Sequence, residues 1–236
     1  MSTSLFITVS TQLCIDWEQG RLGLRHPTKD DCFKKLREIN VPIAAILDVG
    51  VKTCTYELVR CFPDKPHLLM EPIVEYVDDM RANYDKAGID YELISAAMGD
   101  NDGQVRLKTS TVYADKPISH ARITTDGDVD DQHRIVPAMK IDTAVAARAL
   151  PEPFLLKIDV DGAELIVLAG AKETLAKTSV IVIEAGFANL LDRANAIADA
   201  GFEVFDIVDI SYYDGRFVQC DMVFVRSDIV RDNGLE

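Results

Sequence analysis

The sequence lacks a long apolar run, a run of basic residues and any pair of cysteines spaced C-x-x-C. A bilayer-spanning helix needs about 20 consecutive apolar residues, and no stretch of the chain comes close. The N-terminal segment has neither the basic start nor the sustained apolar stretch of a secretion signal. Its 5 cysteines are odd in number and scattered. We therefore expect a cytoplasmic protein with reduced thiols, and neither a disulfide framework nor a zinc site.

Basic residues are also in deficit. The 236 residues contain 25 Lys+Arg against 39 Asp+Glu, a formal net charge of −14. A field of this sign repels phosphate backbones, so we expect neither a nucleic acid nor an anionic membrane surface as partner. A hydrophobic content of 48% is enough for a full core. The length fits a single domain over residues 1–236.

Short apolar runs alternate with longer amphipathic segments along most of the chain. The expected strands are AAILDV (44–49), HLLME (67–71), YELISAAM (91–98), FLLKIDV (154–160) and VIVIE (180–184). The expected helices are 28–39, 73–87, 163–176 and 187–200. This alternation predicts an α/β fold with a mainly parallel sheet and helices on both faces.

Two regions break the alternation. Residues 103–140 contain the strand-like pieces GQVRLKTS and HRIVPAMK, which predict a strand-rich insertion. After Gly201, FEVFDIVD and QCDMVFVR flank Asp214-Gly215, a hairpin signal. A parallel sheet that ends in a hairpin carries one antiparallel strand. Seven strands with an antiparallel last strand are the Rossmann-like topology of class I methyltransferases.

The first strand ends Asp-x-Gly and runs into a helix, in ILDVGVKTCTYELV. Gly50 would let the backbone approach a ligand, and the helix N-terminus offers free N–H groups to a carboxylate. Asp48 would accept a hydrogen bond from an ammonium group or an ordered water. The alternative is an ordinary βα turn, which a single glycine allows.

The next strand ends HLLMEP, with Glu71 about twenty residues beyond Gly50, the spacing at which a carboxylate binds ribose hydroxyls. The alternative is a solvated acid at a strand end. Dinucleotide sites need several glycines in the first turn, where Lys52 and Cys54 stand here. The pair of motifs therefore favours S-adenosylmethionine as the adenosyl cofactor.

A third block, FLLKIDVDGAELIVLAGAKETL, places Lys157 inside an apolar strand and Asp159 and Asp161 at its end. An interior lysine needs a partner, and Glu184 at the end of the neighbouring strand is the expected one, in a structural ion pair. We expect Asp159 to be functional, because the carboxyl ends of central strands line the ligand crevice.

On these motifs the sequence resembles the FkbM family of S-adenosylmethionine-dependent methyltransferases, over residues 44 to about 226. The matching segments are ILDVGVKTCTY, LLMEP, ELISAAMGDNDGQV, LLKIDVDGAELIVLAGA and DIVDISYYDGRFVQCDMVFVR. The resemblance implies methyl transfer, usually to a hydroxyl oxygen of a sugar, a polyketide or another small metabolite.

The resemblance also implies roles for particular residues. Asp48, Gly50 and the amides near Thr53 would hold the methionine part of the cofactor, Glu71 the ribose, and Asp159 would lie beside the methyl-donor centre. The backbone around Ala96 and Ala97 would flank adenine. The whole cofactor-binding set is Asp48, Gly50, Val51, Lys52, Thr53, Tyr56, Glu71, Pro72, Ala96, Ala97 and Asp159. The family usually has Asn in place of Lys52 and Gly in place of Cys54, so a degenerate cofactor-binding protein is an alternative.

A hydroxyl acceptor must lose its proton, either to a positioned base or with the help of a metal that lowers the pKa of the hydroxyl. The candidate bases are Asp159, Asp161 and His120, with His133 as a further one. Both histidines lie in the 103–140 insertion, which we expect to cover the acceptor site, although polar loop histidines are an equally good reading. The alternative is Mg²⁺ held by oxygen ligands from Asp159 and Glu184.

Three further expectations concern partners. An N-methyltransferase is a less favoured alternative, because the fourth strand ends Ile-Asp-Val-Asp-Gly and lacks an Asn/Asp-Pro-Pro-aromatic turn. Acids in 126–131 and at the strand ends favour a neutral or cationic small acceptor, and disfavour a phosphorylated one unless Lys52, His120 or Arg122 offsets them. We expect residues 1–43 to form a helical or extended N-terminal cap, and residues 1–27 within it to close the site or to pack against a second subunit in a homodimer.

Overall fold

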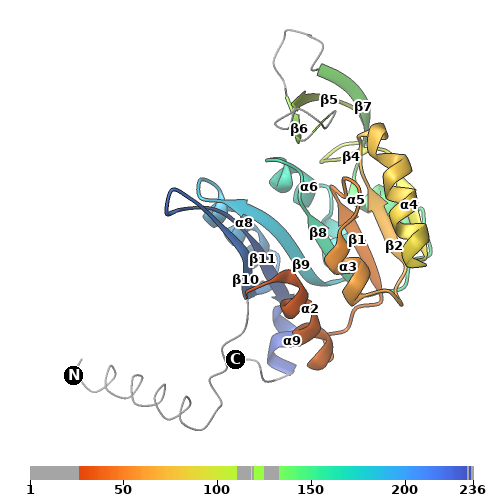
Figure 1. Cartoon of the computed structure of the whole chain (residues 1–236). Helices are drawn as coiled ribbons and strands as arrows, with labels where there is room; N and C mark the ends of the chain where they lie inside the picture. Colours follow the sequence, from red (N-terminus) through yellow and green to blue (C-terminus); the bar gives the residue numbers. More distant parts are fainter. Residues whose placement is uncertain (1–26, 111–117, 119, 125–132, 233, 235–236) are drawn as a thin grey trace.

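The computed structural model describes residues 27–110, 118, 120–124, 133–232 and 234. Its main feature is a seven-stranded sheet in the order β10-β11-β9-β8-β1-β2-β3 (Figure 1). The strands are β1 (Ala45–Val49), β2 (His67–Met70), β3 (Tyr91–Ile94), β8 (Phe154–Ile158), β9 (Thr178–Gly186), β10 (Phe202–Tyr213) and β11 (Arg216–Arg226). Only β11 runs antiparallel to its neighbours, β9 and β10. The predicted topology, a parallel sheet whose last strand is antiparallel, is confirmed.

Helices cover both faces of this sheet, as the alternating pattern predicts. One face carries α5 (Ile141–Ala146), α6 (Glu164–Ala169), α7 (Lys172–Leu175) and α8 (Leu190–Asp199). The other carries α2 (Lys29–Glu38), α3 (Tyr56–Cys61), α4 (Val77–Ala87), which follows the 3₁₀ turn η1 (Val74–Tyr76), and α9 (Ser227–Asp232). Successive residues of β8 alternate between the faces: Leu155 packs with α2 and α3, and Leu156 with α5 and α6.

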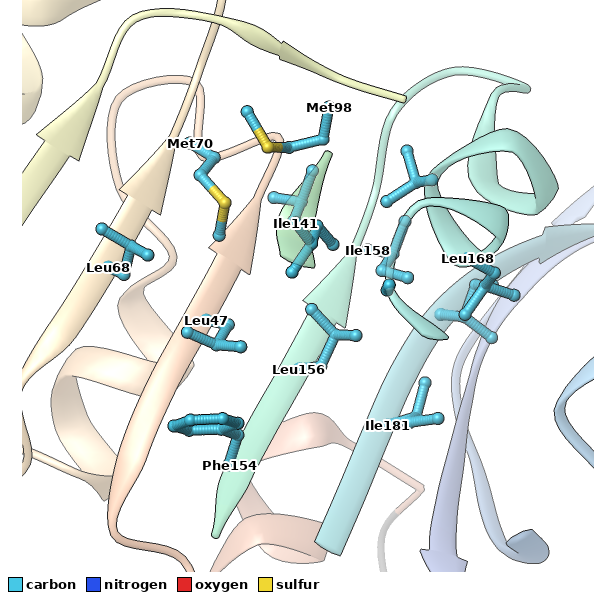
Figure 2. Close-up of a cluster of buried hydrophobic side chains, with 14 of the residues drawn as sticks. Leu47, Leu68, Met70, Met98, Ile141, Phe154, Leu156, Ile158, Leu168 and Ile181 are labelled. Carbon is cyan, nitrogen blue, oxygen red and sulfur yellow. The ribbon is translucent and has the colours of Figure 1, made fainter. Parts of the chain in front are cut away.

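The larger core cluster lies directly beneath the C-terminal ends of the central strands. Every residue of β1 and β8 is buried, as expected of strands that are covered on both faces. Figure 2 shows Met70 and Met98 at the end toward which the strand arrows point, with Phe154 at the opposite end. Each fully buried Leu, Ile or Phe contributes about 1.5–3 kcal/mol to stability, and this layer supports the residues at the strand ends above it.

A second, four-stranded sheet lies beyond those strand ends, in the order β4-β7-β5-β6 (Figure 1). Its strands are β4 (Ala97–Met98), β5 (Gly103–Ser110), β6 (His120–Ile123) and β7 (His133–Met139). The predicted strands GQVRLKTS and HRIVPAMK correspond to β5 and β7. The predicted single strand 91–98 is wrong. Its backbone pairing changes from β2, through the Glu71 N–H to Ile94 carbonyl bond, to β7, through the Gly99 N–H to Met139 carbonyl bond.

Helix and turn signals near the ends of elements are mostly confirmed. Thr28 caps α2 by accepting from the Asp31 N–H at 3.2 Å, and Gly88 ends α4 in the left-handed conformation. Asp214 and Gly215 both have positive φ, as a tight hairpin turn requires. The predicted helix 163–176 is two helices, α6 and α7, with a break at Gly170 and Ala171, and the chain at Gly170 passes so close to Gly99 that a Cβ would lie 1.9 Å from its carbonyl oxygen.

Two predicted segments lie largely or wholly outside the described residues. They are the 1–43 cap, of which only residues 27–43 are described, and the acidic segment 126–131, of which none is. Within the described part, α2 packs against α3 and β10. Of the cysteines, Cys32, Cys54, Cys61 and Cys220 are free thiols. No helix in the described ranges is long and apolar enough to cross a membrane.

Candidate functional site

Two hollows meet where β1, β2, β8 and β9 end. The first, which we call the enclosed cavity, lies between the ends of β1, β2 and β8 and the side chains of Leu107, Ala121 and Ile123 from β5 and β6. The second, the polar cleft, opens beside it and is lined by residues from β5, β6, β9 and β11. Asp161 lines both hollows. Of the predicted site residues, the enclosed cavity is lined by Gly50, Lys52, Glu71, Pro72, Ala97, Asp159 and Asp161.

Glu71 follows β2 and is only 3% exposed. Its two carboxylate oxygens accept from backbone N–H groups, Oε2 from Lys52 and Oε1 from Ile73, both at 2.9 Å. Burial raises the pKa of Glu71, and the two amides oppose this shift. Each oxygen keeps a second lone pair, so the carboxylate is held in place and still has acceptor capacity toward the cavity.

Gly50 sits at the tip of β1 with a φ of +80°, where a Cβ would lie 1.8 Å from the Asp159 carbonyl oxygen. The glycine therefore allows the loop after β1 and the loop after β8 to touch, and both loops line the enclosed cavity. The sequence motif indicated close approach of a ligand at this residue. The structure shows close approach of another backbone segment.

We expect Gly50→Ala to be far more disruptive than Gly88→Ala. Both residues have positive φ, which costs a residue with a side chain about 1–3 kcal/mol. Gly88 has nothing within 4 Å of a Cβ, so only Gly50→Ala adds a collision with the backbone of Asp159. Urea unfolding should give a larger loss of stability for Gly50→Ala, and equal losses would contradict the steric argument.

Lys157 is buried in β8, and its partner is Asp48 rather than the predicted Glu184. Its Nζ lies 3.1 Å from Asp48 Oδ1 and 3.6 Å from Asp159 Oδ2, and it donates to the Gly50 carbonyl at 2.8 Å. The reason is register: Lys157 is paired with Asp48 on β1, whereas its neighbour on β9 is Val182. Glu184 instead accepts from Gln219 Nε2 at 2.7 Å.

The charges around Lys157 keep it ionised in spite of its burial. Desolvation alone would lower the pKa of Lys157, but the carboxylates of Asp48 and Asp159 outweigh it, and the pKa is raised. Asp48 is completely buried and does not line the enclosed cavity. Within the described residues, the ammonium group beside Asp48 is that of Lys157, in an ion pair, and the role expected of Asp48 toward a ligand stays a prediction.

The other predicted cofactor residues lie at different depths. Val51 and Ala96 are buried in the apolar layers, Thr53 is half-buried and Tyr56 is 52% exposed, and none of the four lines the enclosed cavity. The candidate base His120 is in β6, opposite Ser110, and its side chain lies outside the described part.

Asp161 is held at the boundary of the two hollows. Its Oδ2 accepts from the Ala121 N–H at 3.1 Å, and its backbone adopts a positive φ of 51°. This bond ties the loop after β8 to β6. Asp159, two residues earlier, is half-buried and shares the ammonium group of Lys157 with Asp48.

Glu184 is a functional candidate that the sequence analysis named only as the partner of Lys157 and as a ligand of Mg²⁺, and not as a base. It ends the apolar part of β9, is half-buried and lines the polar cleft. Burial raises the pKa of Glu184 from its ordinary value of 4.5 to about 7, and the nearby charges of Asp159, Asp221, Asp161 and Glu164 add to the shift. A carboxylate at a strand end, inside the crevice, was the signal available in the sequence.

The backbone around Glu184 is fixed by Arg193 of α8. Arg193 donates to the Glu184 carbonyl at 2.5 Å and forms a buried ion pair with Glu164. On the other face of the sheet, Asp221 pairs with Lys29 at 2.6 Å. Among the described residues there is no cluster of three or more His, Cys, Asp or Glu side chains that could hold a metal ion, so the Mg²⁺ hypothesis gains no support.

Comparison with known proteins assigns the chain to a family. The sequence model of the Methyltransferase FkbM domain matches residues 44–204, more than half of the chain. Among proteins with curated functions, none matches the sequence significantly.

Solved structures share the fold at low sequence identity. The methyltransferase FkbM from Methylobacillus flagellatus KT is 16% identical, with a TM-score of 0.51 over 76% of this chain and 43% of that one. This chain thus spans less than half of that protein. Precorrin-6y C5,15-methyltransferase from Geobacter metallireducens GS-15 is 13% identical, with a TM-score of 0.45 over 82% of this chain and 87% of that one. Magnesium protoporphyrin IX methyltransferase from Synechocystis PCC 6803, solved with bound S-adenosylmethionine, is 9% identical, with a TM-score of 0.49 over 84% of this chain and 78% of that one.

Proposed function

This chain belongs to the FkbM family of S-adenosylmethionine-dependent methyltransferases, and we propose that it methylates a hydroxyl oxygen of a small molecule. The observation that carries the proposal is that the enclosed cavity and the polar cleft share Asp161 as a wall. A methyl donor in the cavity and an acceptor in the cleft would meet beside this residue and Asp159. Holding two reactants in line is the main contribution of an enzyme to such a displacement.

The residues around the enclosed cavity fit S-adenosylmethionine. Glu71 presents a fixed carboxylate of the kind that accepts from ribose hydroxyls, while Met70, Ile73 and Leu107 offer an apolar surface for a flat base. The cavity holds only about 50 Å³, whereas small-molecule pockets measure about 300–1,000 Å³. Binding of the donor would therefore move the roof, formed by Leu107 and Ile123, outward.

The donor, when bound, supplies an electrophilic methyl group on a positively charged sulfur. The chain contributes negative charge next to that position, from Asp159 and Asp161. Lys52 also lines the cavity, where its ammonium group would pair with the donor carboxylate. Asp48 and Lys157 act from beneath, because their ion pair and the Lys157 to Gly50 carbonyl bond fix the loop that carries Gly50.

We assign proton removal from the acceptor to Glu184 in preference to Asp159, Asp161 and His120. Asp159 is engaged by Lys157, and Asp161 accepts from the backbone of β6. Glu184 faces the polar cleft, and its pKa of about 7 makes it a competent base near neutral pH. Its Oε1 is held by Gln219, which orients the carboxylate.

We expect Glu71→Gln to weaken binding of S-adenosylhomocysteine about 10–100-fold, because hydrogen bonds to a charged group contribute about 1.5–3 kcal/mol each. Glu75→Gln is the matched control, since Glu75 is on the neighbouring turn, pairs with Arg134 and does not line the cavity. Titration calorimetry of both variants measures the difference. Equal affinities for the two would remove Glu71 from the donor site.

Methyl transfer itself is tested with methyl-labelled S-adenosylmethionine and panels of hydroxylated and of amino-bearing small molecules. Label in an O-methyl product, identified by NMR, supports the proposal, whereas label only in N-methyl products contradicts it. If neither S-adenosylmethionine nor S-adenosylhomocysteine binds in calorimetry, the chain is a degenerate member of the family.

A further inference from the structure

Two positively charged side chains stand side by side on the wall of the polar cleft. Lys108 of β5 and Arg122 of β6 are directly opposite each other in the antiparallel ladder, and both line the cleft. Like charges in directly opposed positions destabilise a sheet. Within the described residues, neither side chain has an ion-pair or hydrogen-bond partner. Both side chains are therefore available to bind an anion in the cleft.

Carboxylate partners are common among the other bases of this acidic chain. Many of its Lys and Arg side chains are matched with carboxylates, for example Lys29 with Asp221, Arg60 with Asp30 and Arg193 with Glu164.

Among the described residues, neither acid of the cleft forms an ion pair with Lys108 or Arg122. Asp161 accepts from the Ala121 N–H, and Glu184 accepts from Gln219. The polar cleft thus has a basic wall on the β5–β6 hairpin and an acidic wall at the end of β9. Its volume of about 480 Å³ lies within the range of small-molecule sites, about 300–1,000 Å³.

We propose that Lys108 and Arg122 bind an oxyanion, a carboxylate or a phosphate, on the methyl acceptor, an inference that rests on the proposed function. Arg binds such groups through two parallel N–H donors, and Lys adds a compact charge. With the oxyanion on the basic wall, a hydroxyl elsewhere on the same molecule faces Glu184. The acceptor class is therefore a hydroxylated organic acid or a phosphorylated hydroxyl compound.

This inference revises the expectation of a neutral or cationic acceptor, which was drawn from the net charge of −14. At physiological ionic strength charges are screened beyond about 8 Å, so distant surface acids have little influence inside the cleft. The local pair of cations decides the preference. Arg122 is one of the residues that the sequence analysis named as able to offset the acidic field.

The test uses inorganic phosphate and acetate as probes on the full chain saturated with S-adenosylhomocysteine. Binding is measured at low salt by calorimetry for the wild type, for Lys108→Gln/Arg122→Gln and for Lys34→Gln/Lys35→Gln. The last variant is the matched control, because it removes the same charge from exposed positions on α2, outside the cleft. The stronger of the two probes identifies the kind of oxyanion.

We expect the cleft variant to bind the stronger probe at least about 10-fold more weakly than the wild type, and the α2 variant to match the wild type. Equal binding in the cleft variant, equal loss in both variants, or no binding of either probe to the wild type would overturn the inference. The affinity for S-adenosylhomocysteine, measured first on each sample, tests the proposed function separately. If that affinity is absent while phosphate still binds, the methyltransferase proposal fails, and with it the assignment of the anion to a methyl acceptor.

Discussion

We expect Glu184→Gln to slow methyl transfer by about 10²–10⁴-fold, the contribution that a positioned general base makes. Gln has nearly the same shape, and its carbonyl oxygen can still accept from Gln219, so the lining of the cleft is preserved. What is lost is the ability to take the acceptor proton. The rate is measured as S-adenosylhomocysteine release, with an acceptor identified from the panel described above.

The same role for Glu184 predicts the direction in which kcat/KM changes with pH. A base works in its ionised form, and burial together with the charges of Asp159 and Asp221 raises the pKa of Glu184 to about 7. For the wild type, kcat/KM should therefore rise as the pH increases through about 7 and level off above it. The rising limb should disappear in Glu184→Gln and persist in the control Glu38→Gln, an exposed residue of α2.

Stability provides a check that needs no acceptor. Because the pKa of Glu184 is raised in the folded state, its contribution is fully present below its ordinary value of 4.5 and is lost as the pH rises through about 7. Gln does not ionise. The Tm of the variant relative to the wild type should thus increase between about pH 5 and about pH 8. If Glu184→Gln instead keeps the wild-type rate of methyl transfer and the rising limb of its pH profile, the role of general base passes to Asp159 or Asp161.

The features that can be predicted from sequence are those whose signal is local. The apolar runs of β1 and β8, the glycine that ends α4 and the Asp214-Gly215 turn each carry their information within a few residues. Glu71 belongs to this group, since it is recognised by its strand and by its distance from Gly50. The break between β3 and β4 was missed because the two residues between these strands are Ser95 and Ala96, and neither is a glycine or a proline, the usual signals of a break.

The remainder of the site depends on strand register, which no local pattern specifies. Whether Lys157 meets Asp48 or Glu184 is decided by which residues stand opposite it on β1 and β9. The raised pKa of Glu184 and the Lys108–Arg122 pair have the same origin, because each brings together charges from separate strands.

We expect Lys157→Met to destabilise the fold by about 3–5 kcal/mol, the cost of leaving a buried charge without its partner. Asp48 is fully buried, and its 3.1 Å contact with Lys157 is an ion pair whose angle does not make a hydrogen bond. Without the ammonium group, the Asp48 carboxylate retains, among the described residues, only a long hydrogen bond from the Tyr84 hydroxyl, at 3.5 Å.

A double-mutant cycle separates this charge effect from lost packing. Lys157→Met combined with Asp48→Asn leaves no buried charge, so the double variant should be more stable than Lys157→Met alone, a favourable coupling that urea unfolding measures directly. Lys177→Met is the control, because Lys177 and Glu152 form an exposed pair, 48% and 47% accessible, of a kind that contributes about 0–1 kcal/mol. If Lys157→Met costs no more than Lys177→Met, the Asp48–Lys157 pair does not hold the loop of Gly50. The shape of the enclosed cavity would then depend on the contact between Gly50 and the Asp159 backbone.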